Sequence, residues 1–233
     1  RNVQLDLIPA DMVQTIEVNK VVTADMDADA IGGSINLVTK NTPNKRMFNA
    51  TAGSGYNAVS KKAQLNLGLT YGDRFFNDKL GLMFSGSYQN APGGSDNAEF
   101  EYDVDDGSVV MKEAQMRQYY VTRERQSYSL ALDYEFNPDH KISFKGIYNR
   151  RNDWENRYRV VYKDLDESDP SEQSIELQTK GGADDTRNAR LERQQTMDFT
   201  LDGEHNLGGR LLMDWAASFS RASEDRPNER YFG

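Results

Sequence analysis

Hydrophobic and polar residues alternate strictly along several stretches of the chain after residue 47. In residues 128–136, Tyr128, Leu130, Leu132, Tyr134 and Phe136 are apolar or aromatic, and the residues between them are small or charged. Successive side chains of a strand point to opposite faces, so this period predicts a strand with one apolar and one polar face. The same pattern recurs in residues 63–71, 80–88, 142–148, 197–201 and 211–219, and more weakly in 48–52. We therefore predict seven strands.

The connections between these strands alternate in length. Residues 72–79, 136–141 and 205–210 are short and rich in Gly, Asn, Asp and Pro, which favour tight turns. Residues 91–117 and 161–188 are long and polar, and we predict them to be loops; only the connection at residues 54–60 on that side is brief. Short turns at one rim and long loops at the other are typical of a transmembrane β-barrel.

The length of the alternating stretches and the position of their aromatic residues also fit a transmembrane β-barrel. Nine to eleven residues suffice for a tilted strand to cross a bilayer, and aromatic residues lie near both ends of the stretches: Tyr71, Tyr134 and Phe136 on the turn side, and Tyr88, Tyr128 and Tyr148 on the loop side. A soluble antiparallel sheet with one wet face would show the same alternation. Loop asymmetry and the two aromatic belts favour the barrel. Seven strands leave two open edges, so we expect further strands after Gly233.

Residues 1–43 show a different, mixed pattern. Pro9 can open a short helix, and a strand is expected from Ile16 to Val21. Asp25 or Asp27 can cap a second short helix, which Gly32 and Gly33 can end. A second strand would include Ile35, Leu37 and Val38. We predict a small α/β unit here, and a boundary at a Pro-containing linker, residues 41–45.

This N-terminal segment resembles the C-terminal end of the plug domain in TonB-dependent outer-membrane receptors. That family has an I-E-V-x-K strand, a short helix, and an A-x-G-G-x-I-N-x-x-T-K run that leads into the first barrel strand. The matching residues are Ile16, Glu17, Val18, Lys20, Ala30, Gly32, Gly33, Ile35, Asn36, Thr39 and Lys40. The chain departs from many members at Val21-Val22 and in its aspartate series, which resembles a branch with an acidic "DADAIGG" variant.

The resemblance implies an all-β architecture: an antiparallel transmembrane β-barrel segment of about seven strands, residues 44–233, preceded by a small α/β plug remnant, residues 1–43. The whole barrel would have about 22 strands around the plug. Both ends of the chain look cut, and a TonB box would precede Arg1. The resemblance implies active uptake of a scarce, bulky nutrient (siderophore-iron, vitamin or glycan) across the outer membrane of a Gram-negative bacterium. TonB and outer-membrane lipid would be partners, and a surface lipoprotein is one further partner used in this family.

A second function class stays open: a passive porin, or a structural barrel for adhesion or assembly, without energised transport. The plug-like segment argues against an open pore, and a TonB box with a complete plug would argue against a platform. No feature of the sequence identifies the substrate. The loop at residues 91–117 has seven acids against two bases, which disfavours anionic ligands there.

The composition of the chain argues against several kinds of partner, site and membrane segment. The formal net charge of -9 argues against a nucleic-acid partner. The chain has no cysteine, so a disulfide framework and thiol metal sites are excluded. No run of 18 apolar residues exists to form a transmembrane helix. Mean hydropathy is low at -0.80, but 12 Tyr and 10 Phe in regular patterns distinguish the chain from a disordered one.

We expect no enzyme, no metal site and no cofactor. As a calcium loop, residues 25–36 lack the glycine of the sixth position, where Ala30 lies, and the glutamate of the twelfth, where Asn36 lies. Residues 103–107 are equally weak as a metal site. His140 and His205 each fall in a short turn, and we interpret both as turn or interface residues. Carboxylates are plentiful, but nothing fixes a catalytic pair.

Arginines gather beyond the aromatic belt on the loop side. Strand parity directs Arg123, Arg125, Arg151, Arg157 and Arg159 inward, where Glu124 and other acids could pair with them. It directs Arg150, Arg193 and Arg221 outward. Guanidinium binds phosphate in a bidentate manner, so we predict that these three contact lipopolysaccharide. Plain solvation with weak salt bridges is the alternative for these side chains.

Overall fold

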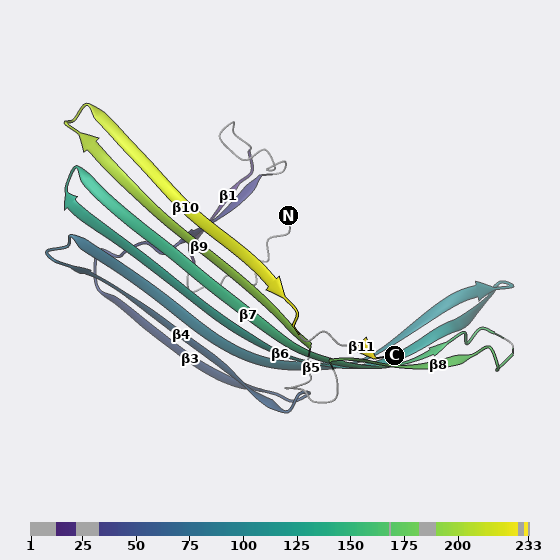
Figure 1. Ribbon diagram of the computed structural model, residues 1–233. Coiled ribbons are helices and arrows are strands. Elements are labelled where there is room, and N and C mark those ends of the chain that lie inside the picture. Colours follow the sequence, from purple (N-terminus) through teal and green to yellow (C-terminus); the bar gives the residue numbers. More distant parts are fainter. Residues whose placement is uncertain (1–12, 22–32, 168, 182–189, 228–230, 233) are drawn as a thin grey trace.

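The computed structural model describes residues 13–21, 33–167, 169–181, 190–227 and 231–232, and all regular structure in these residues is β-strand. Two strands near the N-terminus, β1 (Val13–Asn19) and β2 (Ser34–Thr39), pair as an antiparallel hairpin. The main sheet has the order β10-β9-β7-β6-β5-β4-β3; β8 pairs with the C-terminal part of β7, and β11 pairs with β8. Neighbouring strands are antiparallel throughout (Figure 1).

The seven predicted strands are confirmed, and most are longer than the alternation indicated. They are β3 (Met47–Asn57), β4 (Lys62–Phe75), β5 (Leu80–Asp105), β6 (Ser108–Asn137), β7 (His140–Lys163), β9 (Arg190–Leu207) and β10 (Leu211–Asp225). The antiparallel all-β class is therefore confirmed. The sheet does not close on itself within the described part of the chain, since β3 and β10 each pair with one strand only.

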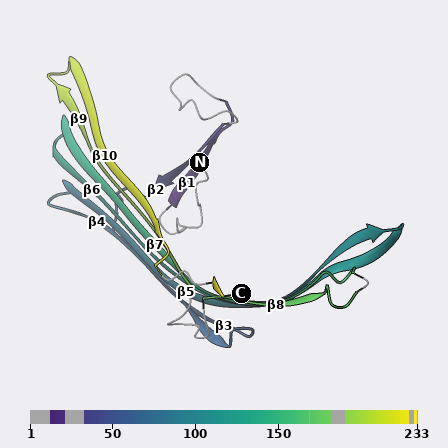
Figure 2. The same cartoon turned by 45° about the vertical axis from the view of Figure 1, so that its right-hand side comes forward.

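The prediction of long loops was wrong in large part. Residues 91–105 continue β5, and residues 108–117 belong to β6; a turn at Asp106 and Gly107, both with positive φ, joins them. Residues 161–163 end β7, and residues 174–180 form β8 (Ser174–Lys180), which pairs with the short β11 (Tyr231–Phe232) near the C-terminus. We call residues 91–125, 150–163 and 174–180 the extension. It continues beyond the other strands and bends upward in Figures 1 and 2.

One face of the sheet below the extension carries a continuous band of apolar side chains. Cross-strand register brings them into rows, for example Tyr71, Phe84, Leu130, Gly146, Phe199 and Phe219. We call this set the band: Phe48, Leu65, Leu67, Leu69, Tyr71, Leu80, Leu82, Phe84, Tyr88, Tyr128, Leu130, Leu132, Tyr134, Ile142, Phe144, Tyr148, Met197, Phe199, Leu201, Trp215 and Phe219. Many of these side chains are exposed. The opposite, polar face carries mostly Ser, Thr, Asn, Gln and Asp.

Glycines within the band lie beneath aromatic rings. A Cβ at Gly146 would meet the rings of Phe199 and Phe144 at 3.1 and 3.3 Å, and those two rings are stacked with centroids 6.3 Å apart. A Cβ at Gly203 would meet the Trp215 indole at 2.5 Å. An aromatic ring that covers a neighbouring glycine stabilises a sheet where the glycine has no side chain to pack. These glycines therefore belong to the packing of the band.

The linker after β2 contacts the polar face. Thr42 Oγ1 donates a hydrogen bond to Asp133 Oδ1, and a Cβ at Gly72 or Gly81 would collide with Pro43 or Thr42. The β1–β2 hairpin lies on the concave side of the sheet in Figures 1 and 2. The N-terminal unit is thus attached on the side that the polar face lines.

The predicted strands of this N-terminal unit are present, with one shift. The strand expected from Ile16 to Val21 is Val13–Asn19, and the strand containing Ile35, Leu37 and Val38 is Ser34–Thr39. The two predicted helices, near Pro9 and after Asp25 or Asp27, lie outside the described residues. The α/β character of residues 1–43 therefore stays a prediction.

Candidate functional site

A cluster of charged side chains occupies the polar face where the extension begins. We call it the charged cluster: Arg123 of β6, Arg151, Asp153 and Glu155 of β7, and Arg190 and Glu192 of β9. Register places Asp153 opposite both Arg123 and Glu192, and Glu155 opposite Arg190. All six side chains share one face because their positions have the same strand parity.

Asp153 is the centre of the first half of the cluster. Its carboxylate accepts two hydrogen bonds from Arg123, with Nε–Oδ1 and Nη2–Oδ2 distances of 2.8 and 2.7 Å. Arg151 lies 3.5 Å from the same carboxylate and 3.6 Å from Glu192. The Asp153 side chain is only 4% exposed. A buried carboxylate is stable in its charged form only with such partners, and the bidentate pair supplies them.

Glu155 is the centre of the second half. Arg190 Nη1 lies 2.6 Å from Glu155 Oε2 and Lys180 Nζ lies 3.2 Å from it, while the Tyr119 hydroxyl donates to Oε1 at 2.8 Å. Burial raises the pKa of Glu155, but the hydrogen bond from Tyr119 and the two cations outweigh burial, so the pKa is lowered overall. Burial and the Glu155 carboxylate raise the pKa of Tyr119, so this phenol remains a donor.

One side of β7 changes its partner strand at the charged cluster. β8 pairs with β7 from Arg157 to Lys163, and β9 pairs with β7 from His140 to Glu155. Between them, Gly181 has a φ of +93°, and a Cβ there would lie 2.3 Å from the Glu155 carbonyl oxygen. Only glycine fits this position. β8 ends at Lys180 and β9 begins at Arg190, and both cations contact Glu155.

Chemically, the charged cluster is a paired network. Its carboxylates are held by guanidinium, ammonium or phenol groups, which leaves no poised acid–base pair of the kind catalysis needs. Within the described residues, no group of three or more His, Cys, Asp or Glu side chains could hold a metal ion. Buried acceptor atoms of neighbouring side chains on this face, Asn149 Oδ1 and Gln194 Oε1, have no hydrogen-bond partner in the described structure.

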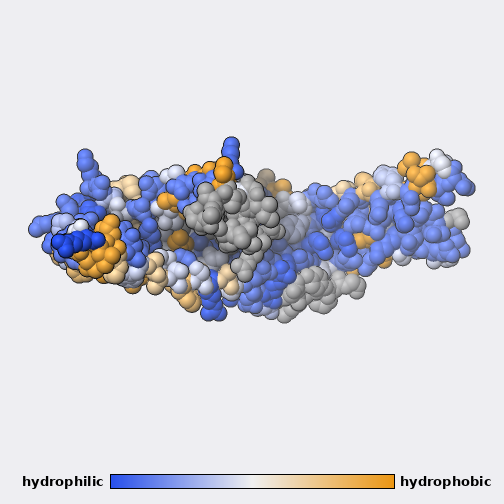
Figure 3. Space-filling view, turned by 90° about the horizontal axis from the view of Figure 1, so that it is seen from above, coloured by the Kyte–Doolittle hydropathy of each residue, from blue (hydrophilic) through white to orange (hydrophobic). Residues whose placement is uncertain are grey.

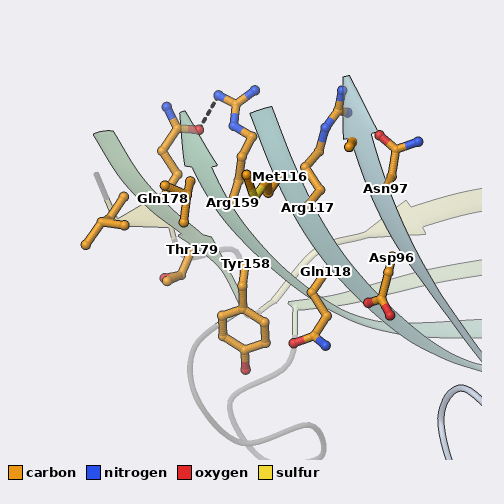
Figure 4. A pocket seen from close by; sticks show the side chains of 12 residues that line it. Asp96, Asn97, Met116, Arg117, Gln118, Tyr158, Arg159, Gln178 and Thr179 are labelled. Atoms are coloured by element: carbon orange, nitrogen blue, oxygen red, sulfur yellow. Dashed lines mark hydrogen bonds between the residues drawn. The ribbon is translucent and has the colours of Figure 1, made fainter. Parts of the chain in front are cut away.

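A hollow of about 710 Å³ lies further along the extension, between β5, β6, β7 and β8. Figure 4 shows Arg117, Arg159 and Gln178 on one side of the strands and Gln118 and Tyr158 on the other. Arg159 donates to Gln115 Oε1 at 3.0 Å and also to Gln178 Oε1, and Arg117 pairs with Glu99. Seen from above, the extension is mostly hydrophilic (Figure 3). The hollow adds no nucleophile or acid–base pair.

The two histidines contact each other at the turn end of the sheet. Their Nδ1 atoms are 3.0 Å apart, and Trp215 Nε1 donates to His205 Nε2 at 3.0 Å. Since an indole N–H only donates, His205 Nε2 accepts, and neutral His205 carries its proton on Nδ1 and donates to His140. An Nδ1 that donates has no lone pair for a metal. The chain Trp215–His205–His140 is therefore a hydrogen-bonded contact between β7, β9 and β10.

The described residues of the plug-like motif lie on the β1–β2 hairpin and beside it. Glu17 pairs with Asn36 and Val18 with Ile35 across the hairpin, and Asn36 Nδ2 donates to Glu17 Oε2 at 3.0 Å. Ile16 lies opposite Leu37, and Thr39 ends β2. Gly33 has a φ of +122°, and a Cβ there would lie 2.4 Å from the Asn19 carbonyl oxygen. Lys20 and Lys40 follow the two strands, and Ala30 and Gly32 lie outside the described residues.

The arginines follow the parity that the sequence predicted, with one difference in pairing. Arg123, Arg125, Arg151, Arg157 and Arg159 lie on the polar face in the strand register. Glu124 has the opposite parity and accepts a hydrogen bond from Asn152, so Arg123 pairs with Asp153 instead. Arg150, Arg193 and Arg221 have the parity of the band. Arg150 and Arg193 both donate to Asn152 Oδ1, at 3.3 and 3.4 Å.

Two features of the extension escaped the sequence analysis. Residues 99–105 alternate acids with Phe100, Tyr102 and Val104, which is the same period that predicts the other strands, and the structure places them in β5 and not in a loop. The pairing of Arg190 with Glu155 could not be predicted, because the residues are far apart in sequence and no pattern sets the β7–β9 register.

No family model, curated protein or solved structure matches this chain. Among the described residues, no helix has the length and apolar composition needed to cross a membrane.

Proposed function

We propose that the chain is part of a TonB-dependent transporter in the outer membrane of a Gram-negative bacterium, where it takes up a scarce, bulky nutrient. The observation that carries the proposal is the division of the main sheet into the band on one face and polar side chains on the other, over seven consecutive antiparallel strands. Such a sheet has lipid on one side and a polar lumen on the other in a transmembrane β-barrel.

Aromatic residues at both margins of the band support the membrane assignment. At the margin toward the extension, the rings of Tyr128 and Tyr148 are stacked with centroids 6.5 Å apart. At the turn margin, Tyr134 and Phe136 meet edge to face at 4.8 Å, and Trp215 lies in the same row as Tyr134. Aromatic girdles at the two lipid–water interfaces flank the apolar band of such barrels.

The N-terminal hairpin supports a plug inside the barrel. The Thr42–Pro43 linker contacts the polar face, which would line the lumen, and the hairpin lies on that side (Figure 2). Three residues of the motif have a structural role in the hairpin: Asn36 donates a hydrogen bond to Glu17, and the backbone at Gly33 has no room for a Cβ. The proposal requires further strands on the outer edges of β3 and β10, because lipid cannot satisfy unpaired backbone groups.

Lipopolysaccharide is the proposed lipid partner of Arg150, Arg193 and Arg221. In the register these residues lie in the row of Tyr148 or in the next two rows toward the extension. No ion pair joins any of the three to a carboxylate of the described residues. Replacement of all three by Gln should reduce the lipopolysaccharide that co-purifies with the protein. Unchanged co-purification would remove this partner, whereas the matched triple replacement of Arg117, Arg157 and Arg159 on the polar face should leave it unchanged.

The first test is the behaviour of the native polypeptide in isolated outer membranes, detected by an antibody to this segment on gels with and without boiling. A closed barrel should migrate faster unboiled. Uptake of iron chelates, cobalamin and glycans would then be compared in cells with and without TonB. Uptake that requires TonB supports the transporter; a barrel with TonB-independent permeability would be a passive porin, and one without uptake an adhesion or assembly platform. A soluble, heat-insensitive species would overturn the proposal.

A further inference from the structure

One side of β5 has no neighbouring strand over most of the extension. β4 pairs with β5 only from Leu80 to Asn90, while β6 pairs with the other side of β5 as far as Asp105. The β3–β4 turn reaches Gly94, where an added Cβ would lie 3.0 Å from Val59 Cγ1. From residue 95 to residue 105 every residue is exposed, and no described strand pairs on that side. We call residues 95–105 the free edge.

The register identifies which backbone groups the free edge presents. Glu135 N donates to Lys79 O, so residues 79 and 135 form a hydrogen-bonded pair, and every second residue of β5 from there bonds to β6. Odd-numbered residues therefore point their N–H and C=O groups toward β6. The even-numbered residues point theirs away, into solvent: Asp96, Ala98, Phe100, Tyr102 and Val104. The bulge at Glu101/Tyr102 places its extra residue in β6 and leaves this order in β5 unchanged.

The side chains of the free edge divide sharply between the two faces. Phe100, Tyr102 and Val104 have the parity of the band and are 48%, 56% and 67% exposed. The opposite face presents only acids from residue 99 onward: Glu99, Glu101, Asp103 and Asp105. Glu99 pairs with Arg117, and Lys112 lies 3.8 Å from Asp103. Neither Glu101 nor Asp105 forms an ion pair with another described residue.

We propose that the free edge is a docking site for an extended polypeptide segment in which basic and apolar residues alternate. Added as an antiparallel strand, such a segment would bond to the exposed backbone groups of Phe100 and Tyr102. Its basic residues would lie opposite the acids, and its apolar residues opposite the aromatic side chains, which are favourable cross-strand pairs. A second copy of β5 is a poor occupant, because the antiparallel pairing would place acids opposite acids.

The proposed docking site consists only of the free edge, so the proposal does not rest on a transport function of the protein. Exposed edges are a liability in sheet proteins, and charged side chains commonly protect them from nonspecific pairing. Four acids on one face, with apolar residues on the other, protect against acidic or wholly apolar strands and leave basic alternating strands as acceptable partners. The acids therefore act as a selectivity device.

The test measures binding of two labelled peptides to the purified full-length protein by fluorescence anisotropy. One peptide alternates Lys with Val over nine residues, and its counterpart carries Glu in place of each Lys. The Lys peptide should bind at least about tenfold more tightly. Phe100→Pro removes a solvent-facing N–H without removing a bond to β6, and Phe100→Ala removes the same ring but keeps the N–H. Binding should fall in the proline variant by about tenfold relative to the alanine variant.

A second pair of variants leaves the backbone unchanged, so a folding failure of the proline variant does not decide the matter. Glu101→Lys with Asp105→Lys should abolish binding of the Lys peptide and create binding of the Glu peptide. Asp214→Lys with Asp225→Lys changes the net charge equally on β10, far from the free edge in the strand order, and should leave binding unchanged. Equal loss in both double variants, or equal binding of the two peptides, would mean nonspecific attraction and overturn the proposal.

Discussion

Strands β5, β6 and β7 each run through two regions, the band and the extension, and the two regions are stabilised on opposite faces of the same sheet. In the band, apolar and aromatic side chains form continuous rows on one face while the other carries small polar groups. In the extension, buried ion pairs fill the polar face around Asp153 and Glu155, while Phe100, Tyr102 and Val104 remain exposed on the other. One strand can thus change its stabilising face along its length.

The difference predicts distinct responses to mutation. The stability of the band depends on an apolar medium against its apolar face, so a charged side chain on that face should destabilise the protein. The extension depends on charge pairing, so removal of one partner should be costly even where the substitute is apolar. The following four experiments test this contrast.

The largest effect is expected at Arg190, whose side chain is 6% exposed and contacts both Glu155 and Glu192. Arg190→Met leaves two partly buried carboxylates without this partner and should destabilise the extension by about 3–5 kcal/mol. Arg226, 43% exposed and 3.4 Å from the same Glu192, is the matched control, with an expected cost of about 0–1 kcal/mol for Arg226→Met. Hydrogen exchange of β7 amides measures both. Similar losses in the two variants would contradict a stabilising role for the buried pairs.

A somewhat smaller loss of stability is expected for a charge on the apolar face of the band. Two adjacent residues on opposite faces, Leu201 and Thr200, provide the test and its control. Leu201→Arg places a charge among the apolar rows and should cost about 2–4 kcal/mol in a bilayer. Thr200→Arg changes the polar face and should cost much less. Unfolding by urea in lipid vesicles compares them. If both variants lose the same stability, the band does not face lipid.

A third experiment removes space beneath an aromatic ring. Gly203→Ala places a methyl group where the Trp215 indole lies, and the resulting overpacking should cost about 1–3 kcal/mol. The ring would also move away from His205, to which it donates a hydrogen bond. Gly53→Ala is the control, because its nearest non-neighbour atom is 3.9 Å from the added Cβ. Tryptophan fluorescence should shift in the first variant only; an unchanged spectrum would show that the ring does not cover the glycine.

The smallest effect concerns acidification of the extension. The pKa of Glu155 is lowered in the folded protein, so its contribution to stability is present above the unfolded value of 4.5 and is lost as the pH falls through the folded value. Tyr119→Phe removes a hydrogen bond that lowers this pKa. The variant should be less stable at neutral pH but should lose less protection than the parent as the pH falls below the unfolded value of 4.5. A larger acid loss in the variant would contradict the assignment.

The sequence predicted the band far better than the extension. Alternation, strict in six strands and weaker in β3, located all seven, because the two faces of a band strand meet different environments and the period records that difference. In the extension, Glu99, Glu101 and Asp103 made a strand resemble a solvated loop, although Phe100 and Tyr102 keep the same period. The charged cluster could not be predicted, since pairs such as Arg190–Glu155 depend on register between strands that a long connection separates.

The separate pairing of β8 and β9 with β7 has a consequence for how this chain can vary. β8 holds its register through its pairs with residues 157–163 of β7, and β9 holds its own through its pairs with residues 140–155. Residues added to the connection between β8 and β9 would therefore cost little more than the slowly rising entropy of a longer connection. The position is therefore suited to natural insertions during evolution and, in the laboratory, to an epitope tag that leaves both strands in place.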